Sequence, residues 1–197
     1  MLDSAIQQVL KPVLNRTARG LVRAGVGADA ISFIGFALGM AAALAIVLQH
    51  FTAGLVLLLL SRLMDGLDGA VARATQPTDR GGFLDITLDF VFYAAIPLAF
   101  ALADPAHNAL PAAVLLASFM GTASSFLAFA IVAAKRELAS TAFPDKSFYF
   151  LGGLTEATET IAAFVAMCLW PQWFAPIAYG LAALCAITTA LRIGWGW

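Results

Sequence analysis

Four aspartates and an arginine lie close together between two strongly apolar segments of this 197-residue chain. They are Asp65, Asp68, Arg73, Asp85 and Asp89. An ionised side chain at membrane depth costs about 2.5 to 3.5 kcal/mol on insertion scales, so such side chains are retained where they bind a ligand or line a wet cavity. The sequence therefore predicts a functional site in this stretch.

The spacing of the aspartates indicates that they share one site. Residues three or four apart lie on the same face of a helix, which pairs Asp65 with Asp68 and Asp85 with Asp89. A turn over Thr75–Arg80 would fold two such helices back together, so that all four carboxylates converge. Carboxylates gathered without His or Cys favour Mg²⁺, Mn²⁺ or Ca²⁺ over zinc or copper. Spacing alone leaves the four aspartates as equivalent candidates.

The same stretch resembles a known signature, D-x-x-D-G-x-x-A-R, a spacer of seven residues, then G-x-x-x-D-x-x-x-D. The fixed positions are filled by Asp65, Asp68, Gly69, Ala72, Arg73, Gly81, Asp85 and Asp89. This signature is that of the CDP-alcohol phosphatidyltransferase family. The resemblance implies an enzyme of phospholipid biosynthesis that transfers a phosphatidyl group from CDP-diacylglycerol to a small alcohol and releases CMP.

The resemblance also implies roles for individual residues. A Mg²⁺ or Mn²⁺ cofactor would be held by Asp65, Asp68, Asp85 and Asp89, and Asp89 would also be the catalytic base. The nucleotide of the donor would lie against Asp65, Asp68, Gly69, Ala72 and Arg73. Arg73 would then stand near the phosphates or tie the carboxylates together.

Composition favours a membrane protein over a soluble one. Hydrophobic residues make up 61% of the chain and charged residues 12%, and the mean hydropathy is +0.88. The length suits an all-α protein with six transmembrane helices of about 20 residues each. The net charge of −1 gives no reason to expect a nucleic-acid partner. Cys168 and Cys185 lie in apolar segments and are expected to be small core residues.

The six spans follow an amphipathic segment. Residues 1–24 alternate apolar and basic side chains at helical spacing, which predicts an interfacial helix on an anionic leaflet or, alternatively, a helix packed on protein. Asp29 is expected to cap the next helix. Gly35 and Gly39 predict close helix packing. The spans are expected at residues 30–49, 54–74, 82–102, 110–135, 147–170 and 173–192, in one domain covering 30–193.

Charge placement predicts the topology. The loops around His50, Asp104 and Pro171 contain no lysine or arginine, whereas the opposite ends of the spans are basic. The positive-inside rule then puts both termini and the aspartate cluster toward the cytoplasm, and we expect a bacterial inner-membrane protein. The small-residue faces and the family resemblance suggest a homodimer. Membrane lipids are the other expected partners.

The acceptor alcohol is less constrained. Candidate acceptor-binding residues are Lys135, Arg136, Lys146, Glu156, Glu159 and Arg192. The basic ones suit a phosphorylated acceptor such as glycerol 3-phosphate or inositol phosphate, unless they only set topology. The two glutamates suit inositol or serine, unless they are structural, and phosphatidylglycerol stays open. Glycerol 3-phosphate is favoured because that activity is common in the family.

Three other interpretations compete with this one. The carboxylates could only pair with Arg62 and Arg73 inside the bundle, but four acids against two bases leave uncompensated negative charge. The cluster, joined by Glu156 and Glu159, could serve a proton- or cation-coupled transporter, although no related halves are visible. An inactive lipid-binding scaffold would not need the complete signature.

Overall fold

The computed structural model describes residues 2–135 and 155–196, and every regular element in these ranges is helical. The elements are α1 (Leu2–Arg23), α2 (Ala28–Val47), α3 (Phe51–Ala74), α4 (Asp79–Ala103), α5 (Pro105–Lys135), α6 (Ala157–Leu169), η1 (Pro171–Trp173) and α7 (Phe174–Gly196). The expected all-α class is confirmed for this part of the chain.

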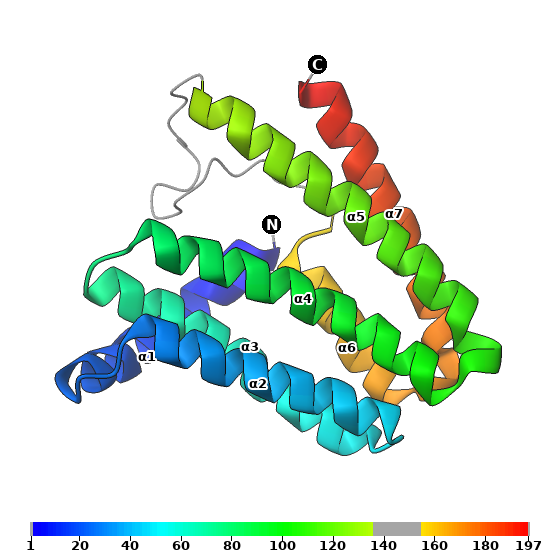
Figure 1. Ribbon diagram of the computed structural model, residues 1–197, viewed down its shortest axis with the longest axis horizontal. Coiled ribbons are helices and arrows are strands. Elements are labelled where there is room, and N and C mark those ends of the chain that lie inside the picture. Colours follow the sequence, from blue (N-terminus) through cyan, green and yellow to red (C-terminus); the bar gives the residue numbers. More distant parts are fainter. Residues whose placement is uncertain (1, 136–154, 197) are drawn as a thin grey trace.

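The helices form two neighbouring groups (Figure 1). Helix α2 packs against both α3 and α4, and α5 and α7 run side by side as a pair. Helix α4 contacts α5, and α6 contacts both α3 and α7, which joins the groups. Because α3 runs antiparallel to α2 and α4, the end of α3 lies beside the starts of those two helices.

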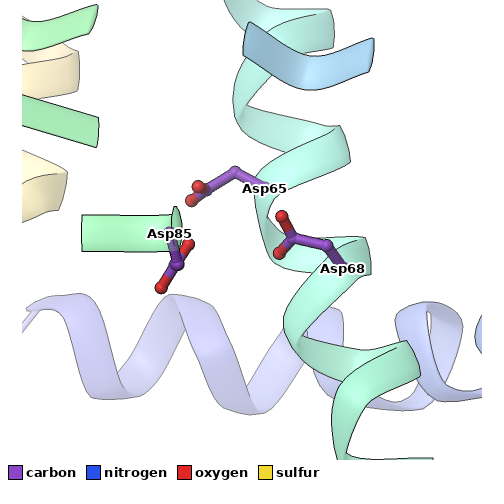
Figure 2. A group of neighbouring side chains, drawn as sticks. All are labelled: Asp65, Asp68 and Asp85. Atoms are coloured by element: carbon purple, nitrogen blue, oxygen red, sulfur yellow. The ribbon is translucent and has the colours of Figure 1, made fainter. Parts of the chain in front are cut away.

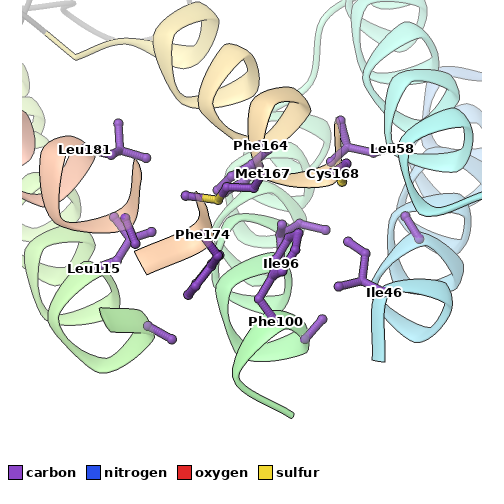
Figure 3. Close-up of a cluster of buried hydrophobic side chains, with 14 of the residues drawn as sticks. Ile46, Leu58, Ile96, Phe100, Leu115, Phe164, Met167, Cys168, Phe174 and Leu181 are labelled. Atoms are coloured by element: carbon purple, nitrogen blue, oxygen red, sulfur yellow. The ribbon is translucent and has the colours of Figure 1, made fainter. Parts of the chain in front are cut away.

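A buried apolar core holds the two groups together (Figure 3). Four fully buried phenylalanines from α4, α6 and α7 dominate it: Phe92, Phe100, Phe164 and Phe174. The rings of Phe100 and Phe174 stack with centroids 4.8 Å apart, and Phe164 meets Phe92 edge-on at 6.4 Å. Such ring pairs fix the relative orientation of the helices that carry them.

Four segments are long and apolar enough to cross a membrane. They are Ala28–Val47, Asp79–Ala103, Pro105–Lys135 and Pro171–Gly194. Helix α3 carries Arg62, Asp65 and Asp68 in its second half, and α6 has 13 residues. By length and composition, therefore, four of the six expected spans are recognisable in the described residues.

One expected helix start is wrong, and a second helix begins inside the span that was expected to contain it. Helix α2 begins at Ala28 after the N-cap Gly27, so Asp29 lies in its first turn and does not cap it. Helix α6 begins at Ala157, and the expected start at 147 lies outside the described residues. Glu156 is the N-cap, because its side chain and that of Glu159 form a reciprocal capping box. This capping box marks the N-terminus of α6.

Helix α1 packs on protein through its apolar face. Ala18 is fully buried and belongs to a cluster with Leu67 and Val71 of α3, against which Leu14 and Leu21 also pack. The helix ends where Gly25 adopts a positive φ of 77°, which closes a Schellman turn. Helix α1 thus supports α3 from one side, and its described arginines remain exposed.

The expected close packing at Gly35 and Gly39 is confirmed. A Cβ on Gly35 would lie 3.0 Å from Cβ of Met64 on α3, and one on Gly39 would lie 2.6 Å from the ring of Phe92 on α4. Both glycines therefore serve contacts within the chain. They lend no support to a dimer interface.

Candidate active site

The four aspartates lie at the end of the bundle where α3 finishes and α4 begins. The Thr78 hydroxyl accepts a hydrogen bond from the Gly81 amide at 3.0 Å, which caps α4 after a turn of a few residues. Asp85 and Asp89 consequently fall early in α4 and face the second half of α3. The predicted folding-back of the two helices is confirmed.

Three of the carboxylates converge on one point (Figure 2). Asp65 and Asp68 of α3 and Asp85 of α4 each offer an oxygen, and these oxygens all lie within 4.8 Å of one another. Asp68 is 5% exposed, whereas Asp85 is open to the outside. A partly buried, oxygen-only ligand set that opens on one side fits a hard divalent cation such as Mg²⁺ or Mn²⁺.

Asp89 stands apart from this group, beside an arginine. Its Oδ1 accepts a hydrogen bond from Nη1 of Arg62 at 2.7 Å, and the same nitrogen lies 3.7 Å from Oδ2 of Asp65. The idea that the acids pair with Arg62 is therefore right for Asp89 and, more loosely, for Asp65. It does not account for the convergence of Asp65, Asp68 and Asp85 on one point.

Arg62 is held firmly by its surroundings. Its side chain is 10% exposed, and its guanidinium carbon lies 3.8 Å from the centre of the Phe92 ring. Its Nη2 donates to the Ser61 hydroxyl at 3.2 Å, and that hydroxyl donates to the Gly35 carbonyl at 2.7 Å. Stacking and hydrogen bonding together fix the position of the positive charge.

A residue that sequence reasoning missed is Ser32 of α2. Its hydroxyl donates to Oδ2 of Asp68 at 2.5 Å and orients that carboxylate. Its polarity within an apolar segment was the available signal, but only the packing of α2 on α3 reveals the contact. A pocket opens over the whole group, lined by Ser32, Gly35, Phe36, Arg62, Asp65, Asp68, Asp85, Leu88 and Asp89.

The residues expected to bind the nucleotide follow Asp65 and Asp68 along α3. Arg73 folds back on its own helix, since a Cβ on Gly69 would lie 3.2 Å from Nη1 of Arg73. The missing side chain at Gly69 thus makes room for the guanidinium, and Ala72 is half-buried beside it.

The acceptor candidates are less clearly grouped. Arg192 of α7 is 9% exposed and donates from Nη1 to the Thr122 carbonyl of α5 at 3.0 Å. Glu159 accepts from the Glu156 amide at 3.0 Å as part of the cap of α6, which is a structural role. Lys135 is exposed at the end of α5. Arg136 and Lys146 lie outside the described residues.

Residues 26–191 match the CDP-alcohol phosphatidyltransferase family, so the chain belongs to that family. It is accordingly a phosphotransferase, and the resemblance seen in the signature is confirmed. Family membership also removes the transporter and the inactive scaffold as interpretations of the aspartate cluster.

Two kinds of relatives share substantial sequence. The inner membrane protein YnjF of Escherichia coli strain K12 is 50% identical over 197 residues, covering 100% of this chain and 96% of the relative. An archaetidylinositol phosphate synthase of Pyrococcus horikoshii is 34% identical over 100 residues, covering 50% of this chain and 53% of the relative.

A solved structure shares the fold. The phosphatidylinositol phosphate synthase PgsA1 of Mycobacterium tuberculosis, in complex with manganese and citrate, superimposes with a TM-score of 0.72 at 23% identity, covering 93% of this chain and 88% of that one. The same protein with CDP-DAG bound gives a TM-score of 0.69 at 22% identity, with 94% of each chain covered. At these identities the likeness establishes a common fold.

Proposed function

We propose that this protein transfers a phosphatidyl group from CDP-diacylglycerol to a small alcohol and releases CMP. One observation carries the proposal: Asp65, Asp68 and Asp85, all signature positions of the family, bring their oxygens within 4.8 Å of one another. The manganese and the CDP-DAG named for the structural relative agree with this choice of cofactor and donor.

The carboxylates would hold the cofactor and prepare the reaction. Asp65, Asp68 and Asp85 would bind Mg²⁺ or Mn²⁺, which when bound neutralises the charge that develops on the departing CMP oxygen. The hydroxyl of Ser32 keeps Asp68 turned toward this position. Gly69, Ala72 and Arg73 would receive the donor's cytidine and phosphates along α3.

The remaining step needs a base, which we assign to Asp89. The hydroxyl oxygen of the acceptor forms a bond to the phosphorus of the phosphatidyl group, and the bond from that phosphorus to the bridging pyrophosphate oxygen breaks. CMP leaves with the electron pair, and the acceptor's proton passes to the carboxylate of Asp89. The Asp89 side chain lines the pocket and is 28% exposed, so an acceptor can reach it.

For the acceptor we favour an alcohol that carries a phosphate, with inositol phosphate ahead of glycerol 3-phosphate. Archaetidylinositol phosphate synthases of Pyrococcus horikoshii and Methanothermobacter thermautotrophicus are 34% and 37% identical over about half of this chain. These relatives favour inositol phosphate over glycerol 3-phosphate, the acceptor expected from the commonness of that activity in the family. Arg192 is the largely buried basic side chain best suited to a phosphate, and Lys135, Arg136 and Lys146 remain candidates.

We further propose six spans, with α3 and the segment containing α6 crossing beside the four long apolar helices. The domain would cover residues 30–193, and the exposed arginines of α1 would rest on the anionic leaflet while its apolar face holds α3. The inner-membrane relative supports this location. Both termini and the pocket would face the cytoplasm, and the homodimer rests on family resemblance alone.

The test is CMP release by the purified protein. We would supply CDP-diacylglycerol and Mn²⁺ with inositol phosphate, glycerol 3-phosphate, inositol, serine or phosphatidylglycerol in turn, each with and without chelator. Chelator-sensitive release with inositol phosphate is the expected result. Release with glycerol 3-phosphate alone would overturn the acceptor assignment. No release with any acceptor, together with no binding of CDP-diacylglycerol, would overturn the proposed function.

A further inference from the structure

We propose that Arg62 takes the place of a second divalent cation in this site. The site then holds one metal ion, on Asp65, Asp68 and Asp85, while the guanidinium supplies the positive charge beside Asp89. This inference rests on the proposed function, since it concerns the cofactor of the same reaction. It changes the expected role of Asp89 from shared metal ligand to a base paired with an arginine.

The carboxylates are already divided in this way. Three of them bring an oxygen to a common point, and the fourth, Asp89, is bonded to Nη1 of Arg62 at 2.7 Å. Four acids of one signature would otherwise form a single cluster of negative charge that could attract two cations. The division follows from the position of the guanidinium.

The guanidinium occupies the space that a second cation would need. An ion such as Mg²⁺ shared by Asp65 and Asp89 would sit about 2.0 to 2.1 Å from an oxygen of each. Nη1 of Arg62 already lies 2.7 Å from Oδ1 of Asp89 and 3.7 Å from Oδ2 of Asp65. A cation placed there would collide with the nitrogen and be repelled by its charge.

Arg62 cannot easily move away to admit an ion. Its guanidinium lies 3.8 Å from the centre of the fully buried Phe92 ring, and Nη2 donates to Ser61. Phe92 in turn fills the space left by the absent side chain of Gly39. Displacing the arginine would break the stacking, the Ser61 hydrogen bond and the ion pair with Asp89 together.

An arginine differs from a metal in ways that can be measured. The guanidinium stays protonated at any working pH and is not removed by a chelator. The number of ions that the protein binds is therefore the property that separates the two arrangements. It can be counted on the protein alone, without substrate or turnover.

The first experiment counts Mn²⁺ ions bound by the full-length protein in detergent micelles, using electron paramagnetic resonance of the free ion. One ion per chain is expected for the unmodified protein. In Arg62→Gln, which removes the charge, a second ion should bind, whereas Arg62→Lys should keep one. Two ions in the unmodified protein, or one in folded Arg62→Gln, would overturn the inference. No bound ion at all would overturn the proposed function instead.

A second pair of variants decides the question even if Arg62→Gln does not fold. Asp85→Asn and Asp89→Asn are the same substitution one helical turn apart on α4. The first should raise the Kd for Mn²⁺ at least about tenfold, and the second by no more than about threefold. Equal weakening by both variants would make Asp89 a metal ligand and overturn the inference.

Discussion

At the scale of single residues, the site contains identical side chains that differ only in their neighbours. Asp68 is buried and receives a hydrogen bond from Ser32, whereas Asp85 is exposed at the mouth of the pocket. Asp89 is paired with Arg62. Their different surroundings are the basis for assigning different roles to four aspartates of one signature.

The assignment of Asp89 as base predicts a separation between turnover and binding. Asp89→Asn should lower the rate of CMP release by about 10²- to 10⁴-fold, because the amide cannot take the acceptor's proton. Binding of CDP-diacylglycerol, measured by titration calorimetry in Mn²⁺, should be nearly unchanged. Asp79→Asn, on the exposed first turn of the same helix, is the control and should keep full activity. Normal turnover in Asp89→Asn would remove Asp89 as the base.

The contact between Ser32 and Asp68 predicts a second effect at this scale. Ser32→Ala removes the hydrogen bond that orients a metal-binding carboxylate, so Mn²⁺ should bind about 10-fold more weakly or worse. Ser124→Ala is the matched control, because that hydroxyl is exposed and bonds to the Gly121 carbonyl within α5. If both variants bind Mn²⁺ like the unmodified protein, Ser32 has no part in holding the ion.

At the scale of helices, the site depends on how closely α2 approaches α3 and α4. Gly35 and Gly39 have no side chains on the faces of α2 that pack against α3 and α4. Ser61 and Phe92 occupy the space beside Gly39. Ser61 and Phe92 are also the residues that hold Arg62. The geometry of the charged site therefore depends on small residues, of which Gly35 lines the pocket and Gly39 lies outside its lining.

The close approach at Gly39 gives a prediction for the α2 helix. Gly39→Ala would place a Cβ 2.6 Å from the buried Phe92 ring and 3.0 Å from the Ser61 hydroxyl. Such overpacking costs about 1 to 3 kcal/mol, so the variant should unfold at a lower temperature in detergent and lose activity. Gly180→Ala, where a Cβ meets nothing within 4 Å, should do neither. Equal thermal stability of the two variants would contradict the tight packing.

At the scale of the whole molecule, the pocket opens at one end of the bundle. The basic residues flank that end, and the loop between α4 and α5 lies at the other. The positive-inside rule predicts that the pocket end faces the cytoplasm, where a cytidine nucleotide would be available. In the proposed orientation the lipid would enter from the membrane and CMP would leave to the cytosol.

This orientation can be tested with two similarly exposed positions. The side chains of Arg80, in the first turn of α4, and His107, in the first turn of α5 at the opposite end of the bundle, are 82% and 81% exposed. In intact spheroplasts a membrane-impermeant maleimide should label His107→Cys and leave Arg80→Cys unlabelled until the cells are opened. Cys168 and Cys185 are buried and should stay unlabelled in the parent protein, which is the control. The reverse labelling would invert the topology.

The sequence by itself determined the helical membrane class, the family and the aspartates. Apolar composition and the periodicity of the segments depend only on local residue order, and the signature fixes its residues at set spacing. Helix ends were less well predicted, as at Asp29 and Glu156, because the caps depend on hydrogen bonds that compete among neighbouring residues.

Only the tertiary structure decided how the charges are shared. Arg62 and Asp89 are 27 residues apart, and Ser32 and Asp68 are 36 apart, so neither contact follows from spacing on one helix. Both arise where α2, α3 and α4 meet, and that meeting depends on the volumes of side chains from all three helices. The sequence determined which residues carry charge, whereas the packing determined which oxygens meet a metal ion and which one meets an arginine.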